Sequence, residues 1–113
     1  MEKHALLYGV QAGDKVHTDF QVRIPVVNDT IEALRLTYEK FGTTEGAVAS
    51  TYFRIAVMAQ VITALGDLPE EEITPDLLLN GMNDDDFDLI DAQIEAIKKK
   101  RLLSNSNSPA IEP

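Results

Sequence analysis

Apolar and polar residues alternate near the start of the chain, which predicts β-structure there. The runs HALLYGV and KVHTDFQVRI are separated by QAGD, whose Gly and Asp suit a turn. In the second run, apolar side chains recur every two residues at Val16, Phe20, Val22 and Ile24, with Thr18 between them. This pattern is typical of a half-buried strand. We therefore predict a β-hairpin over about residues 4–24.

Such a hairpin is only marginally stable alone in water, so its apolar face must lie on helices or pair with another chain. The intervening residues of the second run are expected to face solvent, namely Lys15, His17, Asp19, Gln21 and Arg23.

Helical periodicity dominates the rest of the chain, and the predicted helices cover about residues 29–41, 44–65, 75–80 and 84–103. In the first of them, Asp29 and Glu32 have the spacing of a capping box, and Gly42 follows as a stop. Apolar residues fall on one face of this helix, namely Ile31, Leu34, Tyr38 and Phe41.

The second predicted helix is apolar nearly all round, which is typical of the central helix of a core, and Gly66 follows it. In the third, Thr74 is the N-cap, Pro75 takes the first helical position and Gly81 is the stop. Residues 1–103 are thus predicted to form a single α+β domain, with an N-terminal β-hairpin packed on a bundle of three to four α-helices. The polar, proline-containing residues 104–113 are predicted to be a disordered tail.

The acidic stretch NDDDFDLIDAQIEAIKKKR has two readings. Counted from Asp84, its carboxylates fall at positions 1, 3, 5 and 12, close to the spacing of a calcium-binding EF-hand loop. Such a loop needs Gly at position 6, where this chain has Leu89. Carboxylates are also favoured at the positive end of a helix dipole. We predict a helix and no metal site, because an apolar stripe continues unbroken through the stretch at Phe87, Ile90, Ile94 and Ile97.

Composition and charge narrow the functional classes. The chain has 113 residues, 44% of them hydrophobic, which suffices for one domain with a modest core. It contains no Cys, which fits a reducing cytosol, and we expect no secretory signal and no membrane span. The net charge of −9 opposes binding to nucleic acid or an anionic membrane, and it favours solubility or attraction to a basic partner.

No combination of residues matches a catalytic or cofactor site. His4 and His17 fall on predicted strands without a second metal ligand at suitable spacing, and both are expected to be exposed. The chain has no Cys nucleophile, no glycine-rich phosphate loop and no nucleophile elbow. We therefore predict a protein that is not an enzyme, needs no cofactor and acts by binding other proteins.

The order of these segments resembles the tail assembly chaperones of long-tailed bacteriophages, including Mu-like phages. The resemblance covers roughly residues 16–102 and is carried by FQVRIPVVND, by LGDLPEEEITPDLL and by DDDFDLIDAQIEAI. It implies a protein of the bacterial host cytoplasm that is absent from the mature virion. Its implied partner is the phage tape measure protein, a long helical chain that it keeps soluble, with the tail tube protein as a second candidate partner.

A partner surface can be placed on two parts of the chain. The first comprises apolar residues of the last two helices, namely Leu77, Leu78, Leu79, Phe87, Ile90, Ile94 and Ile97. The alternative is that these residues complete the domain's own core, because amphipathic helices usually bury their apolar face. The second is the strand edge over residues 16–24, which could pair copies into a homo-oligomer.

A second function from a different class also fits the composition. An acidic regulatory protein, either antitoxin-like or an inhibitor that mimics nucleic acid, would carry a carboxylate-dense face for a basic partner. The acidic residues of this chain cluster in residues 67–91, which matches that hypothesis in part.

Overall fold

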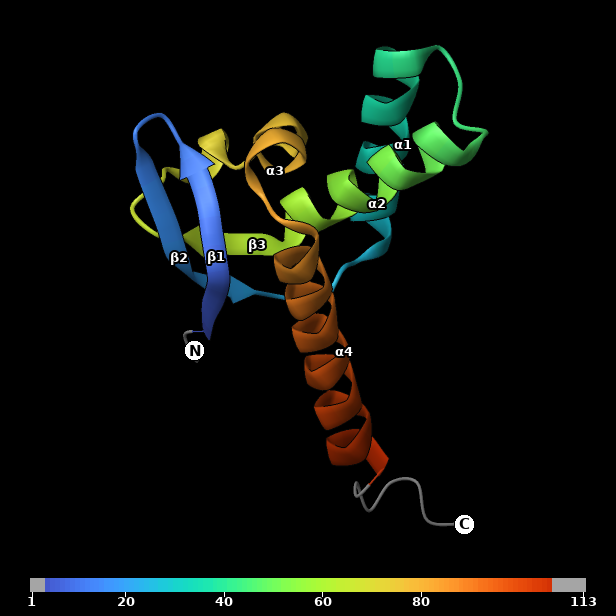
Figure 1. Cartoon of the computed structure of the whole chain (residues 1–113). Coiled ribbons are helices and arrows are strands. Elements are labelled where there is room, and N and C mark those ends of the chain that lie inside the picture. Colours follow the sequence, from blue (N-terminus) through green and yellow to red (C-terminus); the bar gives the residue numbers. More distant parts are fainter. Residues whose placement is uncertain (1–3, 107–113) are drawn as a thin grey trace.

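The computed structural model describes residues 4–106 (Figure 1). Its elements in chain order are β1 (His4–Ala12), β2 (Lys15–Val22), α1 (Val27–Phe41), α2 (Ala47–Val61), β3 (Ile62–Leu65), the 3-10 helix η1 (Glu70–Glu72), α3 (Pro75–Gly81) and α4 (Asp84–Ser106). The predicted α+β class is confirmed, because an N-terminal β-hairpin is followed by α-helices.

The sheet contains a third strand that the hydrophobic pattern did not predict. β3 pairs antiparallel with β2, which gives the strand order β1-β2-β3. The predicted helix over residues 44–65 is therefore wrong in its last four residues. Val61, Ile62 and Thr63 are consecutive β-branched residues, which favour an extended backbone. The predicted pairing edge of residues 16–24 is partly occupied, because β3 pairs with Phe20, Gln21 and Val22 of β2. That the rest of this edge pairs copies stays a prediction.

The pairing of β1 with β2 is interrupted by a bulge. Ala5 pairs with Asp19 and Val10 pairs with His17, so five steps along β1 span only two along β2. Gly9 lies in the inserted part with a φ of 91°. A Cβ at this position would lie 2.9 Å from the carbonyl oxygen of His17. The bulge therefore requires glycine at position 9.

The bulge also changes which residues of β2 face the core. Phe20 is buried as predicted, but near the turn His17 is buried and Val16 is exposed. A Cβ on Gly66 would collide with the imidazole of His17, whose Nδ1 accepts a hydrogen bond of 3.4 Å from the Asp67 N–H. The predicted exposure of His17 is wrong, because strict alternation fails where the strand register shifts.

A single carboxylate satisfies the backbone of the bulge. Asp86, in the first turn of α4, is fully buried. Its Oδ1 accepts a hydrogen bond of 2.6 Å from the Leu7 N–H, and its Oδ2 accepts bonds of 2.9 Å from the N–H groups of Tyr8 and Gly9. The acidic stretch is a helix, as predicted. One of its carboxylates fixes the start of α4 against β1.

The short helix α3 confirms one predicted boundary and corrects another. The Thr74 side chain accepts a hydrogen bond of 3.2 Å from the Leu77 N–H, and Pro75 follows at the first helical position. Gly81 was predicted to stop the helix, yet it belongs to α3. A Cβ there would lie 2.6 Å from the carbonyl oxygen of Gln11. Gly81 thus allows α3 to approach β1 closely.

The main core lies between the sheet, the end of α2, α3 and α4. Its buried side chains come from all of these elements: Leu6, Val10, Phe20, Val22, Met58, Ala59, Val61, Ile62, Leu65, Ile73, Leu78, Ile90 and Ile94. His4 was expected to be exposed, but it is half-buried at the edge of this core, with its ring centroid 5.6 Å from that of Phe20.

Helices α1 and α2 form a hairpin that projects from the sheet on the side away from β1 and β2 (Figure 1). A second, smaller buried cluster joins the two helices, built from Ala33 of α1 and from Tyr52 and Ala56 of α2. Because this cluster is separate from the main core, α1 contributes little to the packing on the sheet.

Helix α4 extends past the sheet at its C-terminal end (Figure 1). Residues 104–106, assigned to a disordered tail by the sequence, belong to this helix. The remainder of the predicted tail, residues 107–113, lies outside the described residues. Within residues 4–106, no helix combines the length and apolar character needed to cross a membrane.

The substitution Asp86→Asn tests the role of this carboxylate. An amide keeps one acceptor oxygen but directs N–H donors at the bulge, so we expect the free energy of unfolding to fall by about 2 to 4 kcal/mol. Chemical denaturation measures this loss. The matched control is Asp85→Asn in the same helical turn, whose side chain is exposed and which should cost less than about 1 kcal/mol. Equal losses for the two variants would contradict the assigned role.

Candidate protein-binding surface

The structure buries three of the seven predicted partner-binding residues and partly buries three more. Leu78, Ile90 and Ile94 are buried in the main core. Leu77, Phe87 and Ile97 are partly buried and pack against that core. The three buried residues expose 5% of their surface or less, so they offer little area to a partner. The stripe on α4 instead completes the domain's core, which is the alternative that the sequence left open.

Three predicted residues, Leu78, Leu79 and Phe87, line a surface groove. Leu79 is 43% exposed, and together with the partly buried Phe87 it borders an open groove of about 420 Å³ between α2, α3 and the start of α4. The guanidinium of Arg54 lies 5.0 Å from the centroid of the Phe87 ring and 3.9 Å from a carboxylate oxygen of Asp91. Arg54 therefore covers part of the apolar lining of this groove.

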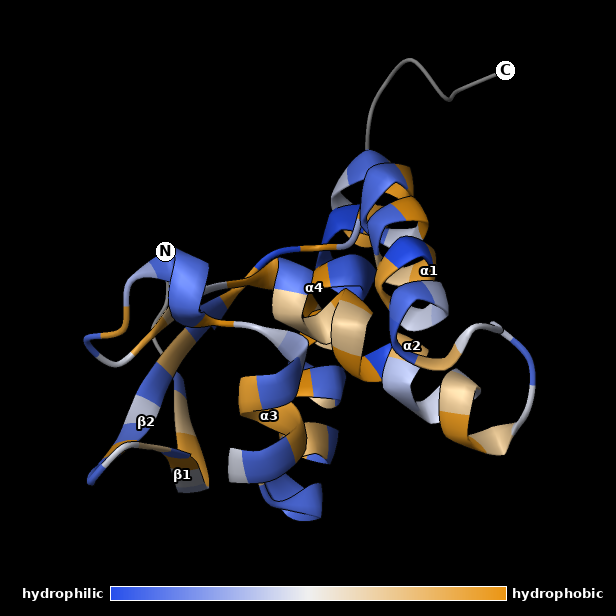
Figure 2. Ribbon diagram, turned by 90° about the horizontal axis from the view of Figure 1, so that it is seen from above, coloured by the Kyte–Doolittle hydropathy of each residue, from blue (hydrophilic) through white to orange (hydrophobic). Residues whose placement is uncertain are grey.

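The largest ordered row of exposed apolar side chains lies on α1, where sequence reasoning placed no partner. We call it the α1 stripe, and its residues and exposed fractions are Val27 79%, Ile31 59%, Leu34 41%, Tyr38 61% and Phe41 39%. They are spaced by four, three, four and three residues, which aligns them along one side of the helix. Hydrophobic segments recur along α1 in Figure 2.

The stripe is exposed because α1 packs on α2 with its other face. The buried residues of α1 are Asp29, Ala33 and Thr37, and the Thr37 hydroxyl donates a hydrogen bond of 2.7 Å to the Ala33 carbonyl. Small side chains on this face let the two helices approach closely. The amphipathic pattern of α1 is thus reversed from the usual arrangement, with small and polar residues inside and large apolar residues outside.

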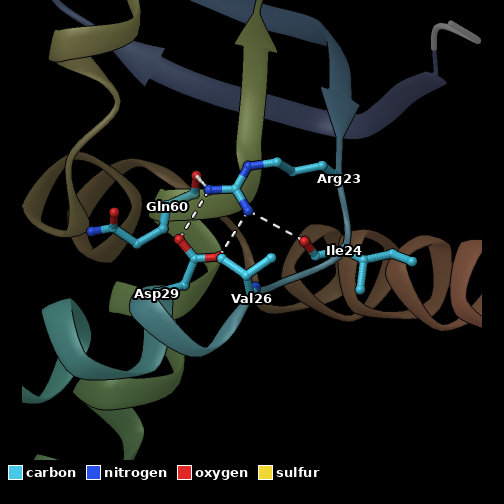
Figure 3. Close-up of polar contacts among 5 residues, drawn as sticks. All are labelled: Arg23, Ile24, Val26, Asp29 and Gln60. Carbon is cyan, nitrogen blue, oxygen red and sulfur yellow. Dashed lines mark hydrogen bonds and ion pairs between the residues drawn. The ribbon is translucent and has the colours of Figure 1, made fainter.

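An ion pair holds the base of α1 (Figure 3). The Arg23 guanidinium donates hydrogen bonds of 2.7 and 2.9 Å to the two carboxylate oxygens of Asp29, and it also donates to the carbonyl oxygens of Ile24 and Gln60. Asp29 also accepts a bond of 2.7 Å from the Val26 N–H. These bonds join the end of β2, the start of α1 and the end of α2.

This geometry corrects the predicted start of the helix. α1 begins at Val27, two residues before the predicted start, and Asp29 lies in its first turn. The predicted capping partner Glu32 instead pairs with Arg35. Hydrogen bonding to Arg23 lowers the pKa of Asp29, and it raises the pKa of Arg23 in turn. The buried Asp29 is therefore held in its ionised form.

The far end of the α1 stripe is also held in place. The ring of Phe41 meets that of Tyr52 edge to face, with 5.5 Å between the centroids. Lys40 lies over the same Tyr52 ring and pairs with Asp76 of α3 at 3.4 Å. Burial raises the pKa of Tyr52. Beside the stripe, Arg35 pairs with Glu32 and Glu39, so the charges on this flank already have partners.

Several carboxylates of the acidic region make internal contacts. Asp67 pairs with Lys15 at 2.6 Å, and the Lys15 hydrogen bond lowers the pKa of Asp67. Asp76 and Asp91 pair with basic residues, and Asp86 is buried. In the described part of the chain, no three His, Cys, Asp or Glu residues are grouped so that they could hold a metal ion.

Comparisons with protein-family models, with curated proteins and with solved structures find no match to this chain. The candidate surface therefore rests on its own geometry.

Aspartate substitutions in the apolar stripes of α4 and α1 test which of the two stripes is buried in the core. Ile94→Asp buries a carboxylate in the main core, so we expect it to remove most of the stability, about 4 kcal/mol or more. Leu34→Asp places the same charge on the exposed face of α1 and should cost less than about 1 kcal/mol. Thermal unfolding followed by circular dichroism measures both. A folded Ile94→Asp variant with near-normal stability would refute the assignment of the α4 stripe to the core.

The lowered pKa of Asp29 predicts a pH-dependent contribution to stability. Because the folded state lowers this pKa below its ordinary value of 3.8, the stabilisation is complete above about pH 5 and is lost as the pH falls further. Asp29→Asn should therefore lower the free energy of unfolding by about 2 to 3 kcal/mol at pH 7, and by less near pH 3.

The variant Arg23→Gln removes the cause of the lowered pKa, so its stability should converge on that of the wild type over the same pH range. Urea denaturation from about pH 7 to pH 3 gives both differences. A difference that stays constant over this range would contradict the account.

Proposed function

We propose that this protein is a bacteriophage tail assembly chaperone that binds the tape measure protein and keeps it soluble until the tail tube protein assembles around it. The observation that carries this proposal is the α1 stripe: a row of large apolar side chains, exposed on a helix whose other face packs on α2. The resemblance of residues 16–102 to this family gives the proposed client.

The shape of the stripe suits a helical client. Its spacing of four and three residues is that of the contact seam between two packed helices. A long helical chain with an apolar face aggregates unless that face is covered. A helix laid along α1 would cover both apolar faces at once, in the helix-to-helix mode of peptide recognition.

The size and charge of the domain suit a reversible contact. The stripe exposes roughly 500 Å² of side-chain surface, which would give an interface at the lower end of the specific range. Such an interface can be displaced when the tail tube protein arrives. Copies that each carry a net charge of −9 would repel one another along the client and keep the complex in solution.

An acidic regulator is supported less well. Its carboxylates would have to face a basic partner, yet Asp67, Asp76 and Asp91 are paired internally and Asp86 is buried. The exposed acids of η1 are the part of the acidic region that fits this alternative best.

Co-expression with the candidate tape measure protein tests the proposed function. We expect the wild-type chain to move the tape measure protein from the pellet into a soluble complex that survives purification. Leu34→Asp should abolish this rescue, because it places a carboxylate in the middle of the contact.

The matched control is Leu79→Asp in the groove between α2 and α3, since Leu79 is 43% exposed and Leu34 is 41% exposed. This variant should keep the rescue. Rescue that depends on Leu79 and not on Leu34 would place the client in the groove and refute the assignment to α1. An insoluble tape measure protein in the presence of the folded wild-type chain would refute the function itself.

A further inference from the structure

We infer that, without a client, two copies of this chain pair through the α1 stripe in an antiparallel arrangement. The proposed occupant of the exposed face of α1 is thus a second copy of the same helix. The pairing does not depend on the proposed function, but it would regulate that function, because the same five side chains cannot serve a client and a second copy together.

The order of residues in the stripe is compatible with a twofold axis. In antiparallel helix pairs, each position of the apolar seam packs beside the alternate position of the partner helix. An axis near residue 36 would therefore place Leu34 beside Tyr38 of the second copy, and Ile31 beside Phe41 of the second copy. In such a symmetric interface, one contact on the first chain is repeated on the second.

The location of α1 leaves room for this pairing. The α1–α2 hairpin projects from the sheet, and within residues 4–106 α1 packs chiefly on α2 (Figure 1). Val26 at the start of α1 and Val48 at the start of α2 are also exposed. Exposed apolar patches of this extent on small proteins commonly mark interfaces.

The surface area that this pairing would bury predicts a weak dimer. Two stripes would bury roughly 1,000 Å² in total, which is the lower limit for a specific interface. The net charge of −9 on each copy opposes association, and salt screens this repulsion. We therefore expect a dissociation constant on the order of 100 µM at low ionic strength, which decreases by about threefold to tenfold in 0.5 M salt. Binding of a basic client would change with salt in the opposite direction.

Charge on the flank does not prevent the pairing. Arg35 lies beside the stripe near the proposed axis, so two like charges would approach each other there. Each guanidinium is already paired with Glu32 and Glu39 of its own helix. Each cluster of one guanidinium and two carboxylates carries a net charge of −1, so the guanidinium is not left unpaired in the contact, and salt screens the repulsion that remains between the two clusters.

Sedimentation equilibrium of the full chain over a concentration series tests the inference. The wild type should show a monomer–dimer equilibrium, and Leu34→Asp should weaken it by at least about tenfold. Leu103→Asp is the control, because Leu103 is exposed on the far end of α4 and this variant should dimerise like the wild type. A wild-type chain that stays monomeric up to about 1 mM, or a loss of dimer in Leu103→Asp alone, would overturn the inference.

Disulfide trapping gives the direction of the pair, and the chain has no native Cys to interfere. Arg35→Cys lies near the proposed axis and should form a cross-linked dimer on oxidation. Thr30→Cys would lie about 18 Å along the helix from its equivalent in an antiparallel pair and should not cross-link. Cross-linking of both variants would contradict the antiparallel arrangement, and cross-linking of neither would refute pairing through α1.

The outcome for the dimer and the outcome for the client are separable. Loss of the dimer with retained rescue of the tape measure protein would refute only the inference. A dimer that forms normally beside a client that stays insoluble would refute only the proposed function.

Discussion

The carboxylate of Asp86 is the interaction on which the arrangement of this domain depends. It satisfies three backbone N–H groups in a part of β1 that β2 cannot pair. Buried N–H groups without acceptors are costly, so the bulge and the first turn of α4 stabilise each other. Once the start of α4 is fixed against β1, Ile90 and Ile94 enter the main core. The apolar face of α4 is therefore buried in the domain's core, whereas the apolar face of α1 is exposed.

Local signals in the sequence predicted much of the fold. The hairpin, the Thr74 cap and the helical nature of the acidic stretch are all confirmed, because turns, caps and periodicity depend on neighbouring residues. The role of Asp86 could not be found in this way. Its partners lie 77 to 79 residues away along the chain, and an Asp in the first turn of a helix already has a sufficient local explanation.

The location of the candidate surface shows why an apolar stripe is an ambiguous signal. Both α1 and α4 carry such a stripe, and periodicity alone does not say which one is buried. The available clue was the opposite face of α1, where Ala33 and Thr37 offer small side chains for close packing on α2. The missed strand β3 has a similar origin, since a short apolar run fits the end of a buried helix as well as a strand.

Hydrogen exchange of α1 in the presence and absence of the tape measure protein tests the central claim most directly. The account predicts that, at a concentration where the free chain is monomeric, added protection of backbone amides is concentrated in residues 27–41 of the complex. Protection concentrated instead around the groove at Leu79 and Phe87, with α1 unchanged, would contradict it.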